Sequence, residues 1–431
     1  MENQARTSMK GYYKTTFLIG LGFFTMGLMD PLLGTYIPIF LNRYVDSRGL
    51  IGFIMTLENF FAIALIPIVT AYSDRTRTRI GRRMPFIIIT LPITAVIFAL
   101  LPFSALHSFW MLIVVIFIMN FFKQSARGPV VALMPDIVPA EIRSEANGII
   151  NTMGGIAAIV GTVVLAQLMD VKIPLPNLGP TDQILAFPVA GMLVVIATFL
   201  LFMFIKERPE KYEDRTHKTS IRESLKLILA GKDKSATLIL IALLCWFIGY
   251  NGVLPFIGMY SIDFLQTSPG LAALAAGMVA IAYAICAIPS GFIAHKVGRK
   301  ATIRFSLAAL VIIMLLVYLH YPVAVMLELP AFIMQITFWI LMFLFGVFWV
   351  AVVTNSFPML WQMATFNDIG IYTGLYYFSS QLAAILAPPV AGGIMDLFGD
   401  RSMYMFATVF MLAAFVIMGF VKGGEPHDRH A

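Results

Sequence analysis

The sequence predicts an all-α membrane protein with about twelve transmembrane helices, arranged as two pseudo-symmetric bundles of six. The first observation is the composition: 59% of the 431 residues are hydrophobic, 12% are charged, and the mean hydropathy is +0.86. A soluble globular chain carries about 25% charged residues, so water is not the main solvent of this chain. The other two observations are the length of the apolar runs and a repeat within the sequence.

The apolar runs have the length that a helix needs to cross a bilayer, which is about twenty residues. Transmembrane β-barrels instead show apolar residues at alternate positions, so we expect the spans to be helices. Six runs lie in each half of the chain. The expected spans are residues 15–41, 50–72, 85–103, 109–134, 146–169, 185–205, 236–258, 271–294, 302–320, 331–355, 371–395 and 403–421.

The distribution of basic residues predicts how the spans are oriented. With both termini inside the cell, the inside segments carry 24 Lys and Arg residues, and the outside connections carry only Arg43, Arg48, Lys172 and Arg401. Because basic residues gather on the cytoplasmic side of membrane proteins, we expect both termini in the cytoplasm and the protein in a bacterial inner membrane. The same bias accounts for the net charge of +7 without a nucleic-acid partner.

A charged stretch divides the chain into two halves. Residues 206–235 are expected to form a cytoplasmic linker between an N-terminal bundle at residues 1–205 and a C-terminal bundle at residues 236–431. Within the linker, Ser220 and Glu223 have the spacing of a capping box that starts a helix. One face of this helix is apolar, so we expect it to lie along the inner membrane surface.

The two halves repeat one another at a fixed offset of 226 residues. Gly148 corresponds to Gly374, and the Met-Asp pair that ends at Asp170 corresponds to the pair that ends at Asp396. Matches of Ala and Ile alone mean little in apolar sequence, but a glycine and a Met-Asp pair at one offset indicate duplication. Duplicated halves are typical of alternating-access transporters, whereas a channel or a receptor does not need them.

A basic loop follows the second predicted span of each half. In the second half, the stretch 291–300 is similar to the G-x-x-x-D-[RK]-x-G-R-[RK] loop of the major facilitator superfamily, with histidine in place of the acid. In the first half the loop is longer, and this form resembles the glycoside and sucrose cation symporter branch, as do the stretches 124–136 and 143–147. The residues of the two loops are Asp74, Arg75, Gly81, Arg82 and Arg83, and His295, Lys296, Gly298, Arg299 and Lys300.

The resemblance implies that these loops act as a gate on the inner side and that the protein works as a monomer. From the residues themselves, glycine permits a tight reversal, arginines attract anionic headgroups, and Asp74 is expected to accept backbone N–H bonds at a helix N-terminus while pairing with an arginine. The alternative is that the loop only anchors the topology. The matching latch of the second half is in doubt, because His295 replaces the acid.

Four ionisable residues lie within the predicted spans of the first half: Asp30, Glu58, Lys123 and Arg127. A charge in hydrocarbon costs at least roughly 2.5–3.5 kcal/mol, so such residues are usually paired and usually mark a pathway. We interpret Glu58, with Asp30, as the acceptor of a proton or sodium ion, balanced by the two cations. The alternatives are a static ion-pair network, and an Arg127 that snorkels or binds the substrate.

Amide and aromatic side chains within the spans are candidates for binding a solute. Sugars are bound by amide and carboxylate hydrogen bonds beneath an aromatic face. Because 13% of the chain is aromatic, a single aromatic residue is more often packing or interface belt, whereas an amide in hydrocarbon must find partners. The candidates are Asn59 and Gln124 in the first half, and Trp246, Tyr250, Asn251, Tyr376 and Gln381 in the second.

Proline and glycine pairs mark two spans as unusual. The pairs Asp30-Pro31 and Pro388-Pro389, the latter followed by Gly392-Gly393, predict broken or bent helices that are useful for gating. The alternative is that they are packing kinks.

The motifs of soluble enzymes are absent from the sequence. There is no GxxxxGK[ST] loop, so we do not expect ATP or another cofactor to supply the energy. Cys245 and Cys286 lie inside apolar runs, and the histidines lack metal-ligand spacing apart from a pair near the C-terminus. We therefore expect neither a disulfide nor a metal site, and we expect that the protein is not an enzyme.

These observations together predict secondary transport of a small polar solute. A sugar or glycoside is favoured by the branch resemblance, and the expected mechanism is rocking of the two halves about a central cavity, driven by a proton or sodium gradient. One alternative is export of amphipathic compounds or lysolipids. A second alternative, from a different class, is a membrane sensor that no longer transports, although the intact basic loop argues against it.

Overall fold

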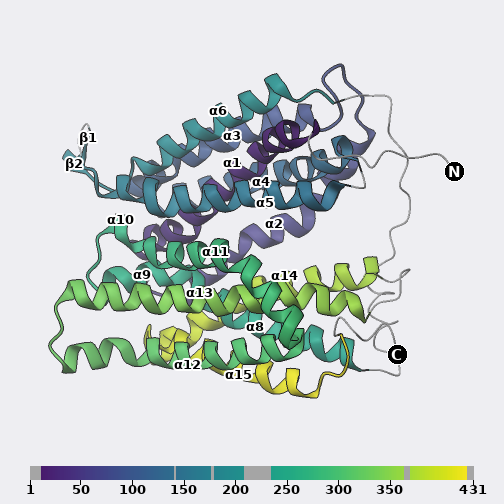
Figure 1. The fold of residues 1–431 in the computed structure, drawn as a ribbon. Helices are drawn as coiled ribbons and strands as arrows, with labels where there is room; N and C mark the ends of the chain where they lie inside the picture. Colours follow the sequence, from purple (N-terminus) through teal and green to yellow (C-terminus); the bar gives the residue numbers. More distant parts are fainter. Residues whose placement is uncertain (1–10, 140–141, 176–178, 208–233, 364–368, 425–431) are drawn as a thin grey trace. The chain divides into compact units, whose positions relative to one another are not determined.

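A computed structural model describes residues 11–139, 142–175, 179–207, 234–363 and 369–424 of the chain. Within these residues, twelve helical segments are long and apolar enough to cross a membrane. This confirms the predicted architecture of a multi-pass, all-α membrane protein (Figure 1). The predicted amphipathic helix of the linker, with Ser220 and Glu223, lies outside the described residues.

The first half of the chain supplies six of these segments. After α5 the fifth span continues as a π-helical turn at Val160–Val164 and a 3₁₀ turn at Leu165–Asp170. A short antiparallel hairpin, β1 (Ile173–Leu175) with β2 (Gly179–Thr181), precedes the sixth span. The helices are α1 (Tyr13–Asn42), α2 (Arg48–Arg75), α3 (Met84–His107), α4 (Phe109–Ile137), α5 (Arg143–Ile159) and α6 (Ala186–Phe204).

The second half supplies the other six segments, two of which are built from more than one helix. The seventh span joins α8 to α9 through a 3₁₀ turn at Leu254–Phe256, and the eighth begins with the short helix α10. The helices are α8 (Ser235–Val253), α9 (Ile257–Asp263), α10 (Pro269–Ala272), α11 (Leu274–Val297), α12 (Arg299–Met326), α13 (Ala331–Gln362), α14 (Ile369–Phe398) and α15 (Ser402–Phe420).

The proline pairs do not break their helices, so the prediction of broken helices is wrong, while a bend at these prolines stays a prediction. Pro31 lies inside α1, and Pro388 and Pro389 lie inside α14, and both helices continue through them. A proline does accompany an interruption at Pro255, in the 3₁₀ turn between α8 and α9. A proline removes only one backbone donor, and neighbouring groups in a membrane bundle can compensate for the carbonyl that it frees.

The helices form two compact units. Each unit contains most of one half of the sequence together with the start of one span from the other half. Unit 1 comprises Met1–Tyr44, Leu57–Asp214 and Ser268–Ala273, and unit 2 comprises Val45–Thr56, Arg215–Thr267 and Leu274–Ala431. The first turns of α2 therefore belong to unit 2, and α10 belongs to unit 1.

The same helix pairings recur inside each unit. In unit 1, α1 packs against α5 and α6, and α3 packs against α4 and α6. In unit 2, α8 packs against α14 and α15, and α12 packs against α13 and α15. These pairings correspond one to one in chain order, as expected for a duplicated bundle.

Within unit 2, the start of α2 approaches α14 backbone to backbone. A Cβ atom added at Gly392 would lie 2.2 Å from the carbonyl oxygen of Arg48, and one added at Gly52 would lie 2.3 Å from that of Pro388. In lipid the hydrophobic effect does not drive helices together, so close van der Waals packing through small residues stabilises their association instead. By contrast, a Cβ atom added at Gly393 meets nothing within 4 Å.

The neighbouring glycines of α14 give a matched test of this contact. Replacing Gly392→Ala should lower the melting temperature in detergent, because overpacking costs about 1–3 kcal/mol. Replacing Gly393→Ala should leave it unchanged or raise it, because alanine favours the helix by about 0.5–1 kcal/mol over glycine. Thermal unfolding followed by intrinsic fluorescence would decide, and equal melting temperatures for the two variants would contradict the packing.

Candidate functional site

A buried lysine joins three helices of unit 1. The Lys123 side chain on α4 is only 2% exposed, and its Nζ lies 2.5 Å from Oδ1 of Asp30 on α1 and 2.8 Å from Oε1 of Glu58 on α2. The two acids are more open, since their side chains are 40% and 30% exposed. Three of the four predicted ionisable residues thus form one network, in which the cation is enclosed and the anions are accessible.

A glutamine adds a second donor to this network. Nε2 of Gln124, which is fully buried, donates to Oε1 of Glu58 at 3.1 Å. Its Oε1 atom is buried and accepts no hydrogen bond from the described residues. Asn59, which follows Glu58 in the sequence, is a half-buried residue of α2. Glu58 is therefore held by one charged and one neutral donor from the same helix.

The fourth ionisable residue stands apart from the ion pairs. Arg127 is half-buried one turn beyond Lys123 on α4, and among the described residues it has no acidic oxygen within 4.0 Å. It is nevertheless close enough to attract the carboxylate of Asp30 electrostatically. Two acids thus share one lysine in direct contact, and the second cation compensates from a greater distance.

Aromatic side chains of unit 2 form a stacked cluster that includes two predicted residues. The rings of Tyr250 and Trp349 are parallel to within 4°, with centroids 4.2 Å apart. Phe247 meets Trp349 and Tyr376 edge to face, at 5.5 Å and 6.2 Å. The hydroxyl of Tyr376 also lies 3.2 Å from that of Ser356. Tyr250 and Tyr376 are therefore parts of one cluster that joins α8, α13 and α14.

The cluster contains residues that the sequence did not single out. Trp349 and Phe345 lie four apart on α13 and so share one helical face, and both stack with Tyr250. Two aromatic residues four apart indicate a shared helical face, but such pairs are common by chance in a chain so rich in aromatic residues. Only the position of α13 beside α8 distinguishes Trp349 from other aromatic residues.

The remaining predicted residues of the second half have different surroundings. Trp246 is fully buried, and among the described residues its indole N–H has no partner. Asn251 donates to the carbonyl of Phe247 in its own helix, at 2.8 Å. Gln381 is half-buried on α14, with a buried Oε1 that accepts no bond from the described residues. Trp246 thus retains an unused donor, Gln381 an unused acceptor, and Asn251 a bond within its own helix.

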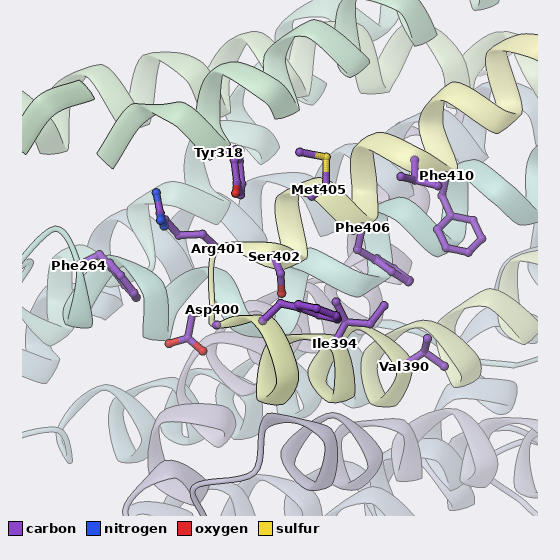
Figure 2. A pocket seen from close by; sticks show the side chains of 13 residues that line it. Phe264, Tyr318, Val390, Ile394, Asp400, Arg401, Ser402, Met405, Phe406 and Phe410 are labelled. Atoms are coloured by element: carbon purple, nitrogen blue, oxygen red, sulfur yellow. The ribbon is translucent and has the colours of Figure 1, made fainter. Parts of the chain in front are cut away.

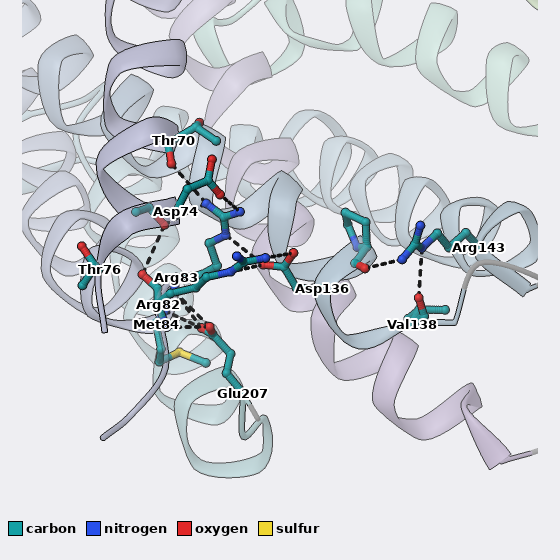
Figure 3. A network of polar contacts seen from close by, with 12 residues as sticks. Thr70, Asp74, Thr76, Arg82, Arg83, Met84, Asp136, Val138, Arg143 and Glu207 are labelled. Atoms are coloured by element: carbon teal, nitrogen blue, oxygen red, sulfur yellow. Dashed lines mark hydrogen bonds and ion pairs between the residues drawn. The ribbon is translucent and has the colours of Figure 1, made fainter. Parts of the chain in front are cut away.

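The basic loop of the first half forms a dense network in unit 1 (Figure 3). Arg82 donates to both oxygens of Asp136, at 2.5 Å and 3.0 Å, and Arg83 donates to the same carboxylate at 2.9 Å. Arg83 also pairs with Asp74, as predicted, and donates to Ser73 at 3.0 Å. One aspartate at the end of α4 therefore binds two adjacent arginines at the start of α3.

The acid at the start of α3 is Glu207 and not Asp74, so that part of the prediction is wrong. The carboxylate of Glu207 accepts backbone N–H bonds from Arg82, Arg83 and Met84, at 2.7–3.1 Å. These donors are free at a helix N-terminus, and an anion there is favoured by the helix dipole. Local sequence patterns do not predict this contact, because Glu207 follows α6 and lies 125 residues from Arg82 in the chain.

In the described part of the chain, the basic residues of the second loop donate to carbonyl oxygens. Arg299 donates to the carbonyl of Pro358 at 3.2 Å, and Lys300 donates to those of Gly419 and Val421 at 3.1 Å and 2.5 Å. His295 and Lys296, three and two positions before the loop glycine, are exposed at the end of α11, as Arg75 is at the end of α2. The loops share their backbone form, because Gly81 and Gly298 both have positive φ, 113° and 100°.

The Met-Asp pairs of the repeat have matching contacts. Asp170 accepts from Ser268 at 2.6 Å and from the backbone N–H of Gly270 at 2.8 Å, in unit 1. Asp396 accepts from Ser47 at 2.7 Å and from the N–H groups of the next two residues at 2.6 Å and 3.0 Å, in unit 2. Each aspartate therefore caps the start of a span that follows a serine. The sequence showed the repeat but not this role.

Comparisons with known proteins bear on the whole chain. The sequence matches the Major Facilitator Superfamily over residues 19–360 and 262–431, and a search of curated proteins gives no match. A bacterial homolog of the human lysosomal transporter Spinster, inward-facing and occupied, has a TM-score of 0.73 at 12% identity, with 96% of this chain and 97% of that chain covered.

Two further solved structures are similar along their full length. A variant of the nucleoside transporter NupG has a TM-score of 0.71 at 11% identity, with 94% of this chain and 100% of that chain covered. A bacterial homologue of the iron transporter ferroportin, inward-facing, has a TM-score of 0.69 at 13% identity, with 95% and 98% covered. Identities this low show a shared fold and leave the substrate open.

The shared lysine predicts an order of stability among variants of the network. Lys123→Met should lower the melting temperature more than Glu58→Gln, because methionine deprives two carboxylates of their cation whereas glutamine leaves Lys123 paired with Asp30. The double variant should lose less than the sum of the two single losses, since the residues are in contact. Thermal unfolding in detergent measures all three, and additive losses would contradict the shared network.

Proposed function

The chain belongs to the Major Facilitator Superfamily, a family of transporters, and from that membership we propose that it is a secondary active transporter of a small polar solute. We favour a sugar or glycoside, moved by alternating access and coupled to a proton or sodium gradient. The observation that carries this proposal is the network of Asp30, Glu58 and Lys123, in which a fully enclosed cation is shared by two accessible acids.

The network supports coupling through competition for one lysine. When a proton or sodium ion neutralises Glu58, this carboxylate attracts Lys123 less strongly, and the ammonium group is then held mainly by Asp30. A static pair would need only one acid for one lysine. The second acid, 30% exposed, supplies a place where a cation from water can bind, and the attraction between Arg127 and Asp30 keeps the site from becoming strongly negative.

The aromatic cluster of unit 2 supports a sugar as the solute. The apolar C–H face of a pyranose packs on a flat aromatic surface, and the half-buried ring of Tyr250, held flat by stacking on the buried Trp349, is the candidate for one. Polar groups that fix orientation are few in such sites. The hydroxyls of Tyr376 and Ser356, and the unused acceptor of Gln381, are groups of this kind in the same unit.

The remaining features are consistent with this mechanism. We propose that residues 1–205 and 236–431 act as the two transport bundles, joined by a cytoplasmic linker at residues 206–235, with both termini in the cytoplasm of a bacterium. The loop around Arg82, Arg83 and Asp136 would then be the inner gate, and the loop at Arg299 and Lys300 its counterpart in the second half. The protein would act as a monomer without a cofactor.

Accumulation in liposomes tests the coupling role of Glu58. Purified protein with labelled sugars, under separate pH and sodium gradients, should accumulate solute under one gradient. Glu58→Gln should lower this accumulation at least about tenfold while solute exchange without a gradient continues, because only the ion site is lost. Glu145→Gln, which replaces an exposed acid on α5, is the control and should accumulate normally.

Three results of this assay would contradict parts of the proposal. Full accumulation by Glu58→Gln would remove the coupling role of that residue. Movement of labelled lysolipid but of no sugar would favour an exporter of amphipathic compounds. Specific binding of a solute without movement under any gradient would favour a sensor.

Substitution of one ring tests the role of the aromatic cluster. Tyr250→Leu should raise the apparent KM for solute about tenfold, because the flat surface is lost, whereas Tyr250→Phe should stay near the original value because the ring remains stacked on Trp349. The ion gradient needed for accumulation should be the same in both. Equal KM values for leucine and phenylalanine would show that the ring does not contact solute.

A further inference from the structure

Charge is distributed unevenly between the two ends of unit 2. At the end where α14 passes into α15, its described residues include two cations, Arg48 and Arg401, and five acids. A cavity at this acid-rich end is lined by Asp400 and Arg401 (Figure 2), and its surroundings carry no net positive charge. The five acids are Asp46, Asp263, Glu328, Asp396 and Asp400.

The opposite end of unit 2 is basic. α12 begins there and α15 ends there, since Arg304 on α12 lies beside Gly419 on α15. The length of α15, about 27 Å, separates this basic end from the acid-rich end. Among the described residues of unit 2, the basic end has six cations and no acid. The cations are Lys234, Lys296, Arg299, Lys300, Arg304 and Lys422.

Arg304 is held in place at the basic end without an acidic partner. Its guanidinium lies over the ring of Phe415 on α15, 4.9 Å from the ring centroid. Its Nε is enclosed and has no hydrogen-bond partner in the described part of the chain. Lys300, one turn earlier, already donates to the carbonyls of Gly419 and Val421 that end α15. Arg304 is therefore not the residue that caps α15, and the described residues give its charge no counter-ion.

A glycine leaves the Nη end of Arg304 uncovered. A Cβ atom added at Gly419 would lie 3.6 Å from Nη2, so the missing side chain leaves room beside the guanidinium. Arg304 and Gly419 are both half-buried. The residues that follow them, Phe305 and Phe420, are both 68% exposed. The guanidinium therefore lies beside exposed apolar side chains and not beside acids.

Exposed apolar side chains continue along both helices from this point. They are spaced by three, four or seven residues, so they share one face of each helix. In a bilayer, an exposed apolar face of this kind is covered by acyl chains, because the hydrocarbon region contains no water. The residues are Ile312, Leu316 and Leu319 on α12, and Val409, Leu412 and Val416 on α15, and they are 46–57% exposed.

We propose that Arg304 binds the phosphate group of one anionic phospholipid, whose acyl chains lie along these faces of α12 and α15. A planar guanidinium donates two parallel hydrogen bonds to phosphate oxygens, and the ring of Phe415 fixes its orientation. The net positive charge of this end favours a headgroup with net negative charge. A zwitterionic lipid brings the phosphate without the net charge, and a free phosphate ion lacks the acyl chains. The site is separate from the ion and solute sites proposed above.

Native mass spectrometry of the full-length protein tests the proposal. Protein in detergent with equal amounts of phosphatidylglycerol and phosphatidylcholine of the same chains should retain phosphatidylglycerol preferentially. Arg304→Gln should lower this preference about fivefold, since one cation is lost from the headgroup site, and Arg304→Lys should keep most of it.

Two control variants separate this site from a general effect of charge. Arg401→Gln removes an arginine from the acid-rich end of the same unit and should retain the full preference. Lys422→Gln removes an exposed cation from the basic end and should lower the preference less than Arg304→Gln, because an exposed lysine is not preorganised for one phosphate.

A steric variant tests the site without changing its charge. Gly419→Leu adds a Cβ atom at ordinary van der Waals distance from Nη2, and the rest of the side chain covers the guanidinium. It should lower the preference as Arg304→Gln does, with melting temperature and monodispersity as checks of folding. Inorganic phosphate at the same concentration should not displace phosphatidylglycerol, because it lacks the acyl chains.

Four results would overturn the proposal. Arg304→Gln could keep the original preference, or Lys422→Gln could lose as much of it as Arg304→Gln does, which would leave only a general attraction to the basic end. Folded Gly419→Leu could retain the full preference, which would place the lipid elsewhere. Displacement of the lipid by inorganic phosphate would show a site for a free anion.

Discussion

The ammonium group of Lys123 sets the arrangement of the first unit. A lysine in hydrocarbon is stable only when anions neutralise it, and the chain provides two, one from α1 and one from α2, while Lys123 itself is on α4. Three helices are thereby fixed about one atom. Because two carboxylates share a single cation, each weakens the attraction between Lys123 and the other. Neutralising one acid would therefore change the contacts of all three helices.

The two units share a scaffold but differ in their polar chemistry. The same helix pairings recur in both, and each has an aspartate at the end of a span that caps the start of another, Asp170 in unit 1 and Asp396 in unit 2. The buried lysine with its two acids and the basic loop bound by Asp136 belong to unit 1, whereas the stacked rings of Tyr250 and Trp349 belong to unit 2. Duplication thus preserved the backbone framework, while the buried side chains of the two units differ.

The basic loops show how one motif can have two structural roles. In the first loop, Asp136 and Glu207 neutralise the arginines and cap α3, so breaking this loop means separating charges. In the second loop, among the described residues, Arg299 and Lys300 donate to carbonyl groups. His295 stands at the position of the acid in that loop, so Asp74 of the first loop has no acidic counterpart there.

The sequence by itself determined the solvent, the number of spans and the identity of the buried charges, because hydrocarbon requires about twenty apolar residues per helix and leaves few ionisable exceptions. It also located the repeat, through Asp170 and Asp396, and the pairing of Asp74 with an arginine. Only the tertiary structure decided that Glu207 caps α3, that Trp349 joins Tyr250, and that Pro31 leaves α1 intact. The first two depend on side chains brought together from segments about 100 or more residues apart, and local patterns of hydropathy and spacing carry no information about such partners.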